Sequence, residues 1–247
     1  MSGPGGGDPA EGDPATAGAI PADGGPLVFV DDLDAPRLAT DDHHHLARVR
    51  RVRDGDPLIL GDGRGAWRRA RMAGDAPEPD GEVVAARRPS PPLAVGFALS
   101  KGDKPEWCVQ KLTELGIDRI VAFTAARSVV RWDDRKAAAA HERLVKVARA
   151  AAAQSRAAHL PVVEPVTDFA AVAARPGACR ADRGGAPPTL AHPLVLVGPE
   201  GGWDETERAA ELPAVGLAGG VLRAETAAIA AGAVLAALRH GLVAPAG

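Results

Sequence analysis

The sequence predicts an α/β protein in which a small all-β domain precedes a larger domain with a parallel sheet. Short apolar runs separated by Asp-Gly and other turn signals fill residues 26–88, as in a small β-barrel. Residues 93–123 follow the order strand, helix, strand, which is a βαβ unit. Residues 194–207 follow the order buried strand, glycine-rich loop, helix start, which is the layout of ligand sites at the carboxyl end of a parallel strand.

Length and composition restrict the class of protein. The 247 residues can hold one large domain or two small ones, and with only 3 % aromatic residues the core must be filled by Leu, Val and Ala. The formal net charge of −3 gives no global signal for nucleic acid. Cys108 and Cys179 are too few for a disulfide framework or a metal site and fit a reducing cytoplasm. The sequence has no apolar run of membrane-spanning length and no signal-peptide pattern.

The first 25 residues are Gly, Pro, Ala and Asp with almost no bulky apolar side chain. Such a segment cannot offset its ordering entropy, so we expect a disordered tail over 1–25. In residues 26–88 the expected elements are a strand at Leu27–Val30, a helix from Thr40, strands at Pro57–Leu60 and Ala66–Met72 around a hairpin turn at 61–65, and a strand at Glu82–Ala86.

Three consecutive histidines, His43, His44 and His45, raise the question of a metal site. Neighbouring residues of a helix point about 100° apart, so three in a row cannot converge on one ion, and we expect no metal. Arginines around them would form either a basic face for RNA phosphates or a merely solvated surface. These arginines are Arg48, Arg50, Arg51, Arg53, Arg64, Arg68, Arg69 and Arg71.

A proline-rich linker over 89–92 separates the two expected domains, and the second domain covers 93–247. Its expected elements are a strand at Leu93–Leu99, a helix from Pro105 that ends at Gly116, a strand at Arg119–Phe123, a helix from Asp134 to about Ala158, and a short helix at Asp168–Ala174. Residues 176–189 are rich in Gly, Pro and Arg and should be a surface loop. Lys101 and Arg127 follow strand ends, where they would hold a phosphate or a flipped base.

The second domain is organised around residues 194–205. Leu194–Val197 is expected to be a short buried strand, and Gly-Pro-Glu-Gly-Gly at 198–202 a sharp loop. The glycines let the backbone approach a flat ligand because no Cβ intervenes. Asp204 is the expected N-cap of the helix that follows.

A second stretch, Val221–Ala227, has the sequence Val-Leu-Arg-Ala-Glu-Thr-Ala and leads into an Ala-rich helix to about Arg239. The order GPEGG and then LR-x-ET-A at the C-terminus resembles the RsmE family, the 16S rRNA uridine-N3 methyltransferases of the SPOUT superfamily. KGDKPEW-x-VQK from Lys101 and HHL-x-RV-x-R from His44 resemble further stretches of that family. The chain departs from the family where Ala153 replaces a Glu.

The resemblance also implies a strand over 189–193 that ends in a His-Pro pair. In this chain GPEGG follows that pair after only four residues, which leaves no room for the crossover that a parallel strand requires. Either the crossover is absent, or the His-Pro strand does not lie there.

The resemblance further implies a SPOUT α/β domain with a trefoil knot, preceded by a PUA-like β-barrel domain, and S-adenosylmethionine as methyl donor. Cofactor contacts are expected from both motifs and from the His-Pro pair, namely Gly198, Pro199, Glu200, Gly201, Gly202, Leu217, Leu222, Thr226 and His192. RNA contacts are expected from Arg48, Arg51, Arg64, Lys101 and Arg127.

Methylation of uridine N3 requires removal of its proton or strong stabilisation of the uridinate, because that proton has a pKa well above neutral. Arg223 is the preferred candidate for stabilising the anion, and Glu225 for orienting it or acting as base. A structural arginine beside the cofactor and a helix-start carboxylate are the alternatives. No metal is required, because the sulfonium already makes the methyl group electrophilic.

The family implies 16S rRNA or the small ribosomal subunit as partner, a homodimer, and a cytoplasmic location. Two alternatives stay open. The chain is either a SPOUT enzyme for another RNA such as tRNA, or a catalytically inactive RNA-binding module that kept the fold.

Overall fold

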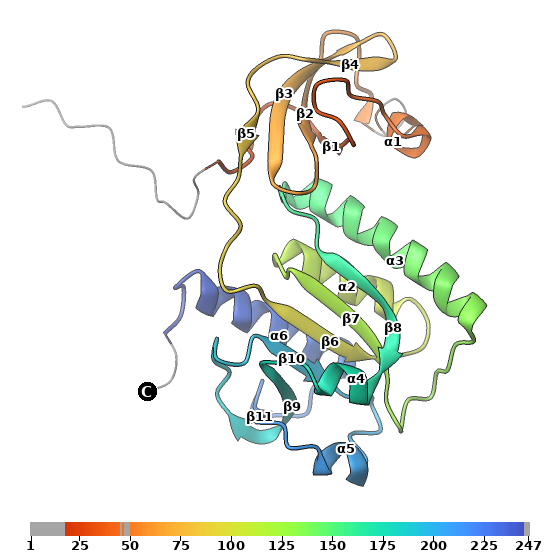
Figure 1. Ribbon diagram of the computed structural model, residues 1–247, viewed down its shortest axis with the longest axis vertical. Coiled ribbons are helices and arrows are strands. Elements are labelled where there is room, and N and C mark those ends of the chain that lie inside the picture. Colours follow the sequence, from red (N-terminus) through yellow and green to blue (C-terminus); the bar gives the residue numbers. More distant parts are fainter. Residues whose placement is uncertain (1–17, 45, 47–49, 245–247) are drawn as a thin grey trace, which may run out of the picture.

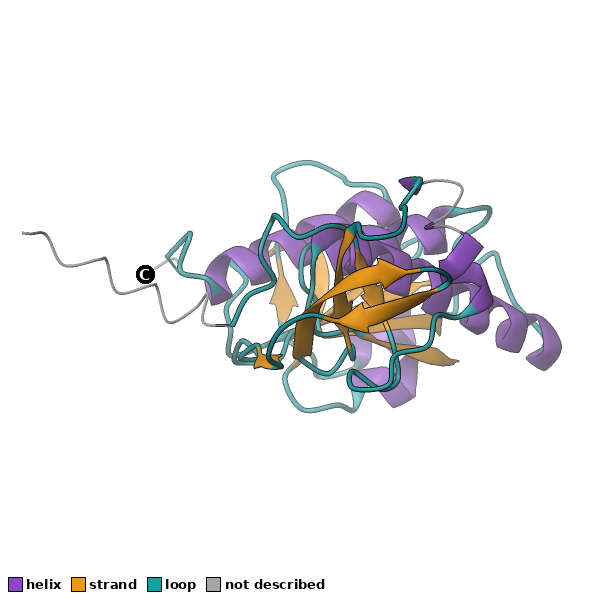
Figure 2. Ribbon diagram, turned by 90° about the horizontal axis from the view of Figure 1, so that it is seen from above, coloured by secondary structure: helices purple, strands orange, loops and turns teal. Residues whose placement is uncertain are grey.

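The computed structural model of the protein describes residues 18–44, 46 and 50–244. Two separate β-sheets organise these residues, one above the other in Figure 1. The helices other than α1 gather around the lower sheet, whereas α1 lies beside the upper one; Figure 2 looks down onto the upper sheet with the lower one behind it. In the described ranges, the helices are too short or too polar to cross a membrane.

The first sheet is built from short strands between turns, as the sequence predicts. Its elements are β1 (Leu27–Phe29), α1 (Thr40–His44), β2 (Pro57–Gly61), β3 (Ala66–Ala73), β4 (Ala76–Pro79) and β5 (Val84–Ala85). The predicted hairpin is confirmed as the antiparallel pair β2–β3. β1 joins β2 in parallel, and β4 and β5 both pair with β3. The strand β4 was not expected, because two of its four residues are prolines.

The second sheet has six parallel strands in the order β11-β9-β10-β6-β7-β8. Its elements are β6 (Ala94–Ala98), α2 (Lys104–Glu114), β7 (Arg119–Thr124), α3 (Asp134–Ser155), β8 (Val162–Asp168), α4 (Phe169–Ala173), β9 (Ala178–Ala186), β10 (Leu194–Val197), α5 (Glu205–Ala209), β11 (Ala214–Val215) and α6 (Ala224–Arg239). The predicted βαβ unit is confirmed as β6-α2-β7.

Alternating side chains of the central strands enter two different cores, because successive residues of a strand point to opposite faces. Val195 and Val197 of β10 pack with residues of α2, α3 and α6. Leu194 and Leu196 pack on the other face, with Phe169 and Trp203. Burial on both faces explains why β10 is apolar at every position.

Two expectations about residues 176–193 are wrong. The expected surface loop contains β9, which pairs in parallel with β10 over Ala178–Arg180. The expected His-Pro strand over 189–193 is a turn instead. β10 therefore lies between β6 and β9. Arg180 is the last residue of β9 that pairs with β10, and residues 181–193 supply the connection of a dozen or more residues that a parallel pair requires.

One apolar cluster joins the two domains where the end of α3 packs against the first sheet. Phe29, Trp67 and Ala152 are among its buried members. Backbone hydrogen bonds join the same parts, since Leu160 N donates to Gly63 O at 2.8 Å. Residues 18–25, expected to be disordered, also take part: Ile20 is buried in the cluster and Gly18 O accepts from Trp67 Nε1 at 2.6 Å. The single large apolar side chain of that segment explains its packing.

Candidate functional site

The carboxyl ends of β10, β6 and β7 meet at one edge of the second sheet, because these strands lie side by side and run parallel. The glycine-rich loop 198–204 leaves β10 at this edge. Residues 217–222, which precede α6, come against that loop. Together they enclose a cavity of about 210 Å³. The cavity therefore lies where parallel sheets place ligands.

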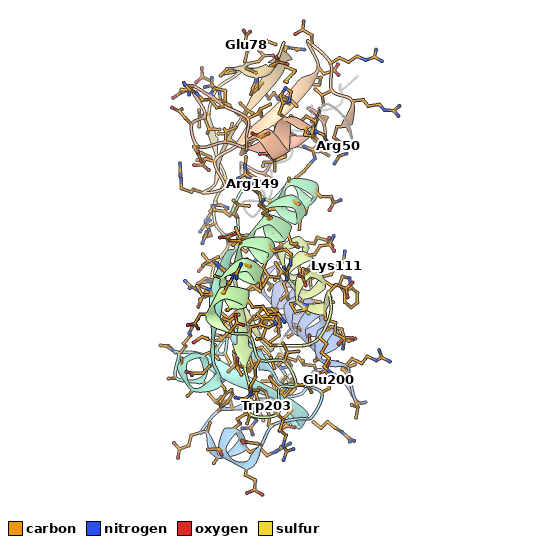
Figure 3. All side chains as sticks on the ribbon, turned by 90° about the vertical axis from the view of Figure 1, so that its right-hand side faces the viewer. Arg50, Glu78, Lys111, Arg149, Glu200 and Trp203 are labelled. Atoms are coloured by element: carbon orange, nitrogen blue, oxygen red, sulfur yellow. The ribbon has the colours of Figure 1, made fainter. Side chains whose placement is uncertain are left out.

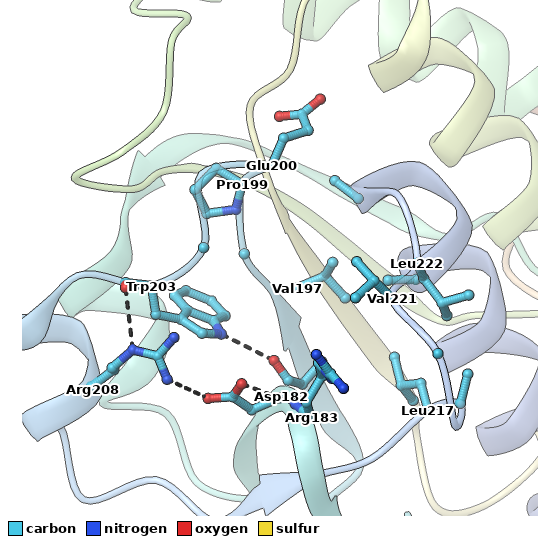
Figure 4. Close-up of a pocket in the computed structure, with 17 residues that line it drawn as sticks. Asp182, Arg183, Val197, Pro199, Glu200, Trp203, Arg208, Leu217, Val221 and Leu222 are labelled. Atoms are coloured by element: carbon cyan, nitrogen blue, oxygen red, sulfur yellow. Dashed lines mark hydrogen bonds and ion pairs between the residues drawn. The ribbon is translucent and has the colours of Figure 1, made fainter.

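Three chain segments line the cavity, as Figure 4 shows. They contribute Ala181, Asp182 and Arg183 after the paired part of β9, Val197 to Trp203 except Gly201 from β10 and its loop, and Leu217, Ala218, Gly220, Val221 and Leu222 before α6. Apolar side chains gather at Val197, Leu217 and Leu222. The charged side chains of the lining are Asp182, Arg183, Glu200 and Arg208. An apolar wall with a few polar groups is the usual lining of a small-molecule site.

Trp203 anchors the glycine-rich loop to the sheet. Its side chain is buried, stacks on Phe123 with ring centroids 6.2 Å apart, and lies at a tilt to Phe169. Its indole Nε1 donates to Ala181 O at 3.0 Å, which joins two of the segments around the cavity. Gly198 is required here because an added Cβ would lie 2.9 Å from the indole ring.

A capping box fixes the chain after the loop, as expected from Asp204. Asp204 Oδ1 accepts from Glu207 N at 2.7 Å, and Glu207 Oε2 accepts from Asp204 N at 3.0 Å. The other oxygen of Glu207 accepts from Ala126 N at 2.8 Å, which ties α5 to the loop after β7. Arg208 Nη1 donates to Asp182 Oδ2 at 2.9 Å and closes the floor of the cavity. Contacts among β9, the segment after β10 and the loop after β7 thus hold the cavity in place.

Lys104 connects the two motifs. Its Nζ lies 2.9 Å from Glu200 Oε1 in the glycine-rich loop and 3.3 Å from Glu225 Oε2 in the first turn of α6. The Lys104 ammonium holds the pKa of Glu200 below its ordinary value, and Glu200 in turn raises the pKa of Lys104. Glu225 is 7 % exposed, and its Oε2 has the ion pair but no hydrogen bond among the described residues.

Cys108 lies close to Lys104 and Glu225, and its thiol is not reactive. Burial, reinforced by the negative charge of Glu225, raises the pKa of its thiol to about 12. The thiol therefore stays protonated near neutral pH and is not a nucleophile.

Comparison with known proteins identifies the family. The model of the RNA methyltransferase domain matches residues 87–236, and that of the RNA methyltransferase PUA domain matches residues 38–77. The ribosomal RNA small subunit methyltransferase E of Mycobacterium bovis is 35 % identical over 241 residues, covering 84 % of this chain and 90 % of that protein. The chain belongs to the RsmE family of RNA methyltransferases.

Solved structures extend the RsmE likeness over both sheets. A ribosomal RNA small subunit methyltransferase E from Neisseria gonorrhoeae, bound to S-adenosyl methionine, matches with a TM-score of 0.71 and 26 % identity, covering 84 % of this chain and 95 % of that chain. A probable rRNA-methyltransferase from Porphyromonas gingivalis matches with a TM-score of 0.74 and 26 % identity, covering 88 % of this chain and all of that one. These matches confirm the predicted order of domains, an α/β methyltransferase domain after a PUA-like domain.

Most of the residues expected to bind a cofactor in this RsmE chain line the cavity, namely Gly198, Pro199, Glu200, Gly202, Leu217 and Leu222. The other three expected residues, Gly201, Thr226 and His192, are not among the residues that line the cavity. Gly201 faces the loop after β7, where Arg127 Nη1 donates to its carbonyl at 3.1 Å. Thr226 is exposed in the first turn of α6. His192 precedes β10 and so lies at the opposite end of that strand from the cavity.

The two expected catalytic residues flank the same corner of the cavity but differ in environment. Arg223 is the exposed N-cap of α6, between the lining residues Leu222 and Ala224. Within residues 18–44, 46 and 50–244, its side chain makes no hydrogen bond or ion pair, so the guanidinium is available to a ligand. Glu225 is buried and paired with Lys104, which restrains its carboxylate.

The expected RNA-binding residues are spread over both domains. Arg48 lies outside the described residues. Arg51 is exposed after α1 with a φ of 54°, and Arg64 is exposed at the tip of the β2–β3 turn, paired with Asp62. Lys101 and Arg127 are exposed on the loops after β6 and β7, at the same sheet edge as the cavity.

Sequence reasoning did not find three charged residues of the site. Asp182 and Arg183 fall in the stretch expected to be a surface loop, and only the pairing of β9 brings them to the cavity. Lys104 stands in the motif KGDKPEW, and that motif was the available signal. In the described part of the chain, no cluster of His, Cys, Asp and Glu could hold a metal.

Proposed function

We propose that the protein transfers a methyl group from S-adenosylmethionine to N3 of a uridine in 16S rRNA of the small ribosomal subunit. The observation that carries the proposal is the cavity at the end of β10, which the GPEGG loop and the segment before α6 enclose in a chain of the RsmE family. Relatives of this chain are named for methylation of the small ribosomal subunit RNA.

The chemistry of the lining fits this cofactor. When bound, S-adenosylmethionine supplies a methyl group on a positively charged sulfur. The Arg183 guanidinium matches the carboxylate of the cofactor. Asp182 and Glu200 place two carboxylates in the lining beside its positive charges, each also paired with a basic side chain, Arg208 or Lys104. The apolar side chains of Leu217 and Leu222 offer a surface to its adenine.

Arg223 is proposed to stabilise the uridinate. Its exposed guanidinium lies next to the cavity and is not committed to a partner among the described residues. Positive charge beside O2 or O4 of uridine lowers the cost of removing the N3 proton, and the same contact strengthens as negative charge develops in the transition state.

Glu225 is proposed to orient the site rather than to take up the proton. Its buried carboxylate is held by Lys104 at 3.3 Å and stands at the first turn of α6, directly behind Arg223. The ion pair restrains the position of this carboxylate, which suits a role in holding the site in place.

The proposal extends to partners and location. The RNA would contact Arg51, Arg64, Lys101 and Arg127 through its phosphates, and the protein would act as a homodimer in the cytoplasm. The trefoil knot stays a prediction from the family. The inactive-module alternative draws support from Ala153 and from the short stretch after Pro193. The second reason is weakened, since residues 181–193 connect β9 to β10.

Calorimetric titration with S-adenosylmethionine is the first test. The half-buried Leu217→Trp should fill the cavity and abolish binding, whereas Leu242→Trp, at a side chain that is 77 % exposed, should bind like wild type. Absence of wild-type binding would leave an RNA-binding module.

Methyl transfer then identifies the substrate. Small ribosomal subunits from a strain lacking the modification, and separately tRNA, are incubated with labelled cofactor, and the product nucleoside is identified by mass spectrometry. N3-methyluridine in 16S rRNA is the expected product. Methylation of tRNA alone, or of another uridine position, would contradict the proposal.

A further inference from the structure

A second cavity, of about 400 Å³, lies where the two sheets' domains meet. Its wall combines the segment after α3, the end of α6, the start of the described chain near Ile20 and the interdomain stretch near Arg87. This cavity is distinct from the one at β10, because the two share no lining residue.

Two arginines of this cavity hold buried nitrogens without a partner among residues 18–44, 46 and 50–244. Arg239 has a side chain that is 3 % exposed, and its two terminal nitrogens bind Asp118 and Gly116 O, yet its Nε has no hydrogen bond to any of these residues. Arg156 donates from Nη2 to Gly25 O at 2.7 Å, and its buried Nη1 finds no acceptor among them. A buried donor without an acceptor is costly, so two at one cavity indicate a missing acceptor.

Charge at the cavity favours an anion. Arg87 is exposed at the rim and has no ion pair in the part of the chain that the structure describes. Arg88 lies close enough to contribute to the environment of His159. The acidic groups nearby are already engaged, Asp118 by Arg239 and Asp62 by Arg64. His240 also lines the wall. Around this cavity, the arginines therefore outnumber the carboxylates that could pair with them.

From these observations we infer that the domain junction binds a phosphate group, with Arg156 and Arg239 at its base and Arg87 at its rim. A phosphate offers several strong acceptor oxygens, and planar guanidinium groups recognise them by paired hydrogen bonds. A phosphodiester of the substrate RNA is the favoured source, since the junction adjoins the PUA-like domain. That source rests on the proposed function, whereas the phosphate site itself does not.

The junction is suited to hold such a group because it is already formed. Leu160 N donates to Gly63 O, and the apolar cluster around Trp67 joins the domains. A preformed site loses little ordering entropy when its ligand binds.

His159 reports on the site directly, because it lines the cavity. Burial, together with the positive charge of Arg88, lowers the pKa of His159. Inorganic phosphate is added to the full chain and the His159 ring is followed by NMR against pH. Phosphate should raise the pKa of His159 in wild type and in Arg135→Ala, which removes an exposed arginine about 30 Å away at the other end of α3. It should leave the pKa unmoved in Arg156→Gln.

RNA binding distinguishes the source of the phosphate. Affinity for a short single-stranded RNA is measured against salt for wild type, Arg87→Ala, Arg156→Gln and Arg135→Ala. Each lost phosphate contact should lower the slope of log affinity against log salt by about 0.7, and Arg87→Ala gives this result without touching a buried group. A phosphate effect on His159 with unchanged RNA slopes would assign the site to free phosphate. Neither a His159 shift nor a change of slope would overturn the inference.

Discussion

Lys104 joins the glycine-rich loop beside the β10 cavity to the first turn of α6. Glu200 in the glycine-rich loop and Glu225 in the first turn of α6 are 25 positions apart, and one ammonium lies within 3.3 Å of both carboxylates. Figure 3 shows Glu200 at the lower end of the molecule, near Trp203. Without the ammonium, the two carboxylates would lie close together with no positive charge between them, and like charges repel.

Replacing Lys104 should therefore weaken cofactor binding. Lys104→Met keeps the apolar stem and removes the charge, and we expect S-adenosylmethionine affinity to fall roughly three- to tenfold, since a partly exposed ion pair contributes about 1 kcal/mol. Lys104→Arg should retain most of the affinity. Calorimetry on the three proteins measures this, and equal affinities for wild type and Lys104→Met would exclude the role.

The same pair predicts a pH dependence of stability. Lys104 lowers the pKa of Glu200 in the folded protein, so the pair stabilises the fold above the ordinary value of 4.5 and is lost as the pH falls through the lower folded value. The raised pKa of Lys104 keeps the pair intact up to and beyond 10.5. The difference in unfolding free energy between wild type and Lys104→Met should thus be constant around neutral pH and shrink in acid. Urea titrations across pH test this, and a difference that persists when Glu200 is protonated would contradict it.

At the scale of single residues, the sequence predicts features whose signals lie close together along the chain. Three such features are the glycine-rich loop, the N-cap Asp204 of α5, and Arg223 beside the cavity. The Lys104 link could not be predicted, since its partners are about a hundred residues away along the chain. Charge pairing across such separations depends on the fold.

Among the elements, the strands that the sequence did not predict share physical causes. β4 and β8 are end strands of their sheets and both contain proline. Proline is tolerated on an edge, where its missing N–H deprives no neighbour, yet it reads as a strand breaker in sequence. β9 pairs with β10 over only Ala178–Arg180, and its register with β11 shifts between Ala214 and Val215. Its glycines and charges therefore reflect an irregular strand.

The position of β9 depends on Trp203, which leads to a prediction for this element. Trp203→Phe keeps an aromatic ring near Phe123 but loses the bond from Nε1 to Ala181 O, and should cost about 1 kcal/mol. Trp203→Ala removes the buried ring and should cost about 3–5 kcal/mol. Denaturant unfolding measures both, and cofactor affinity should fall in the same order because Ala181 lines the cavity. Unchanged affinity in both variants would show that the loop is held by other contacts.

In the whole molecule, the arrangement of the two domains depends on contacts that no sequence pattern announces. Arg149 of α3 donates to Phe29 O at 2.6 Å and to Asp42 Oδ2 at 3.0 Å, and its guanidinium lies over the Phe29 ring. Figure 3 places Arg149 at the level where α3 meets the first sheet. The sequence predicts two domains and a linker, but their docking arises from α3 packing on β1.

Gly65 offers a way to loosen that docking at a single position. It has a φ of +114°, and an added Cβ would lie 2.4 Å from His159 Nε2 across the junction. Gly65→Ala should therefore push the hairpin turn away from the segment after α3. Gly81 has a similar φ of +136°, but its added Cβ would meet only an ordinary contact at 3.7 Å. Gly81→Ala thus introduces the backbone strain alone, without the clash. Such strain costs of order 1–3 kcal/mol.

If the docking joins the domains into one cooperative unit, wild type and Gly81→Ala should each unfold in a single calorimetric transition, with Gly81→Ala at a lower temperature. Gly65→Ala should unfold in two transitions, because the sheets lose their shared cluster before either core melts. Two transitions in wild type would mean that the apolar cluster at the junction is too weak to couple the domains. A single transition in Gly65→Ala, at the temperature of Gly81→Ala, would mean that His159 yields to the added methyl group and that the junction adapts without separating.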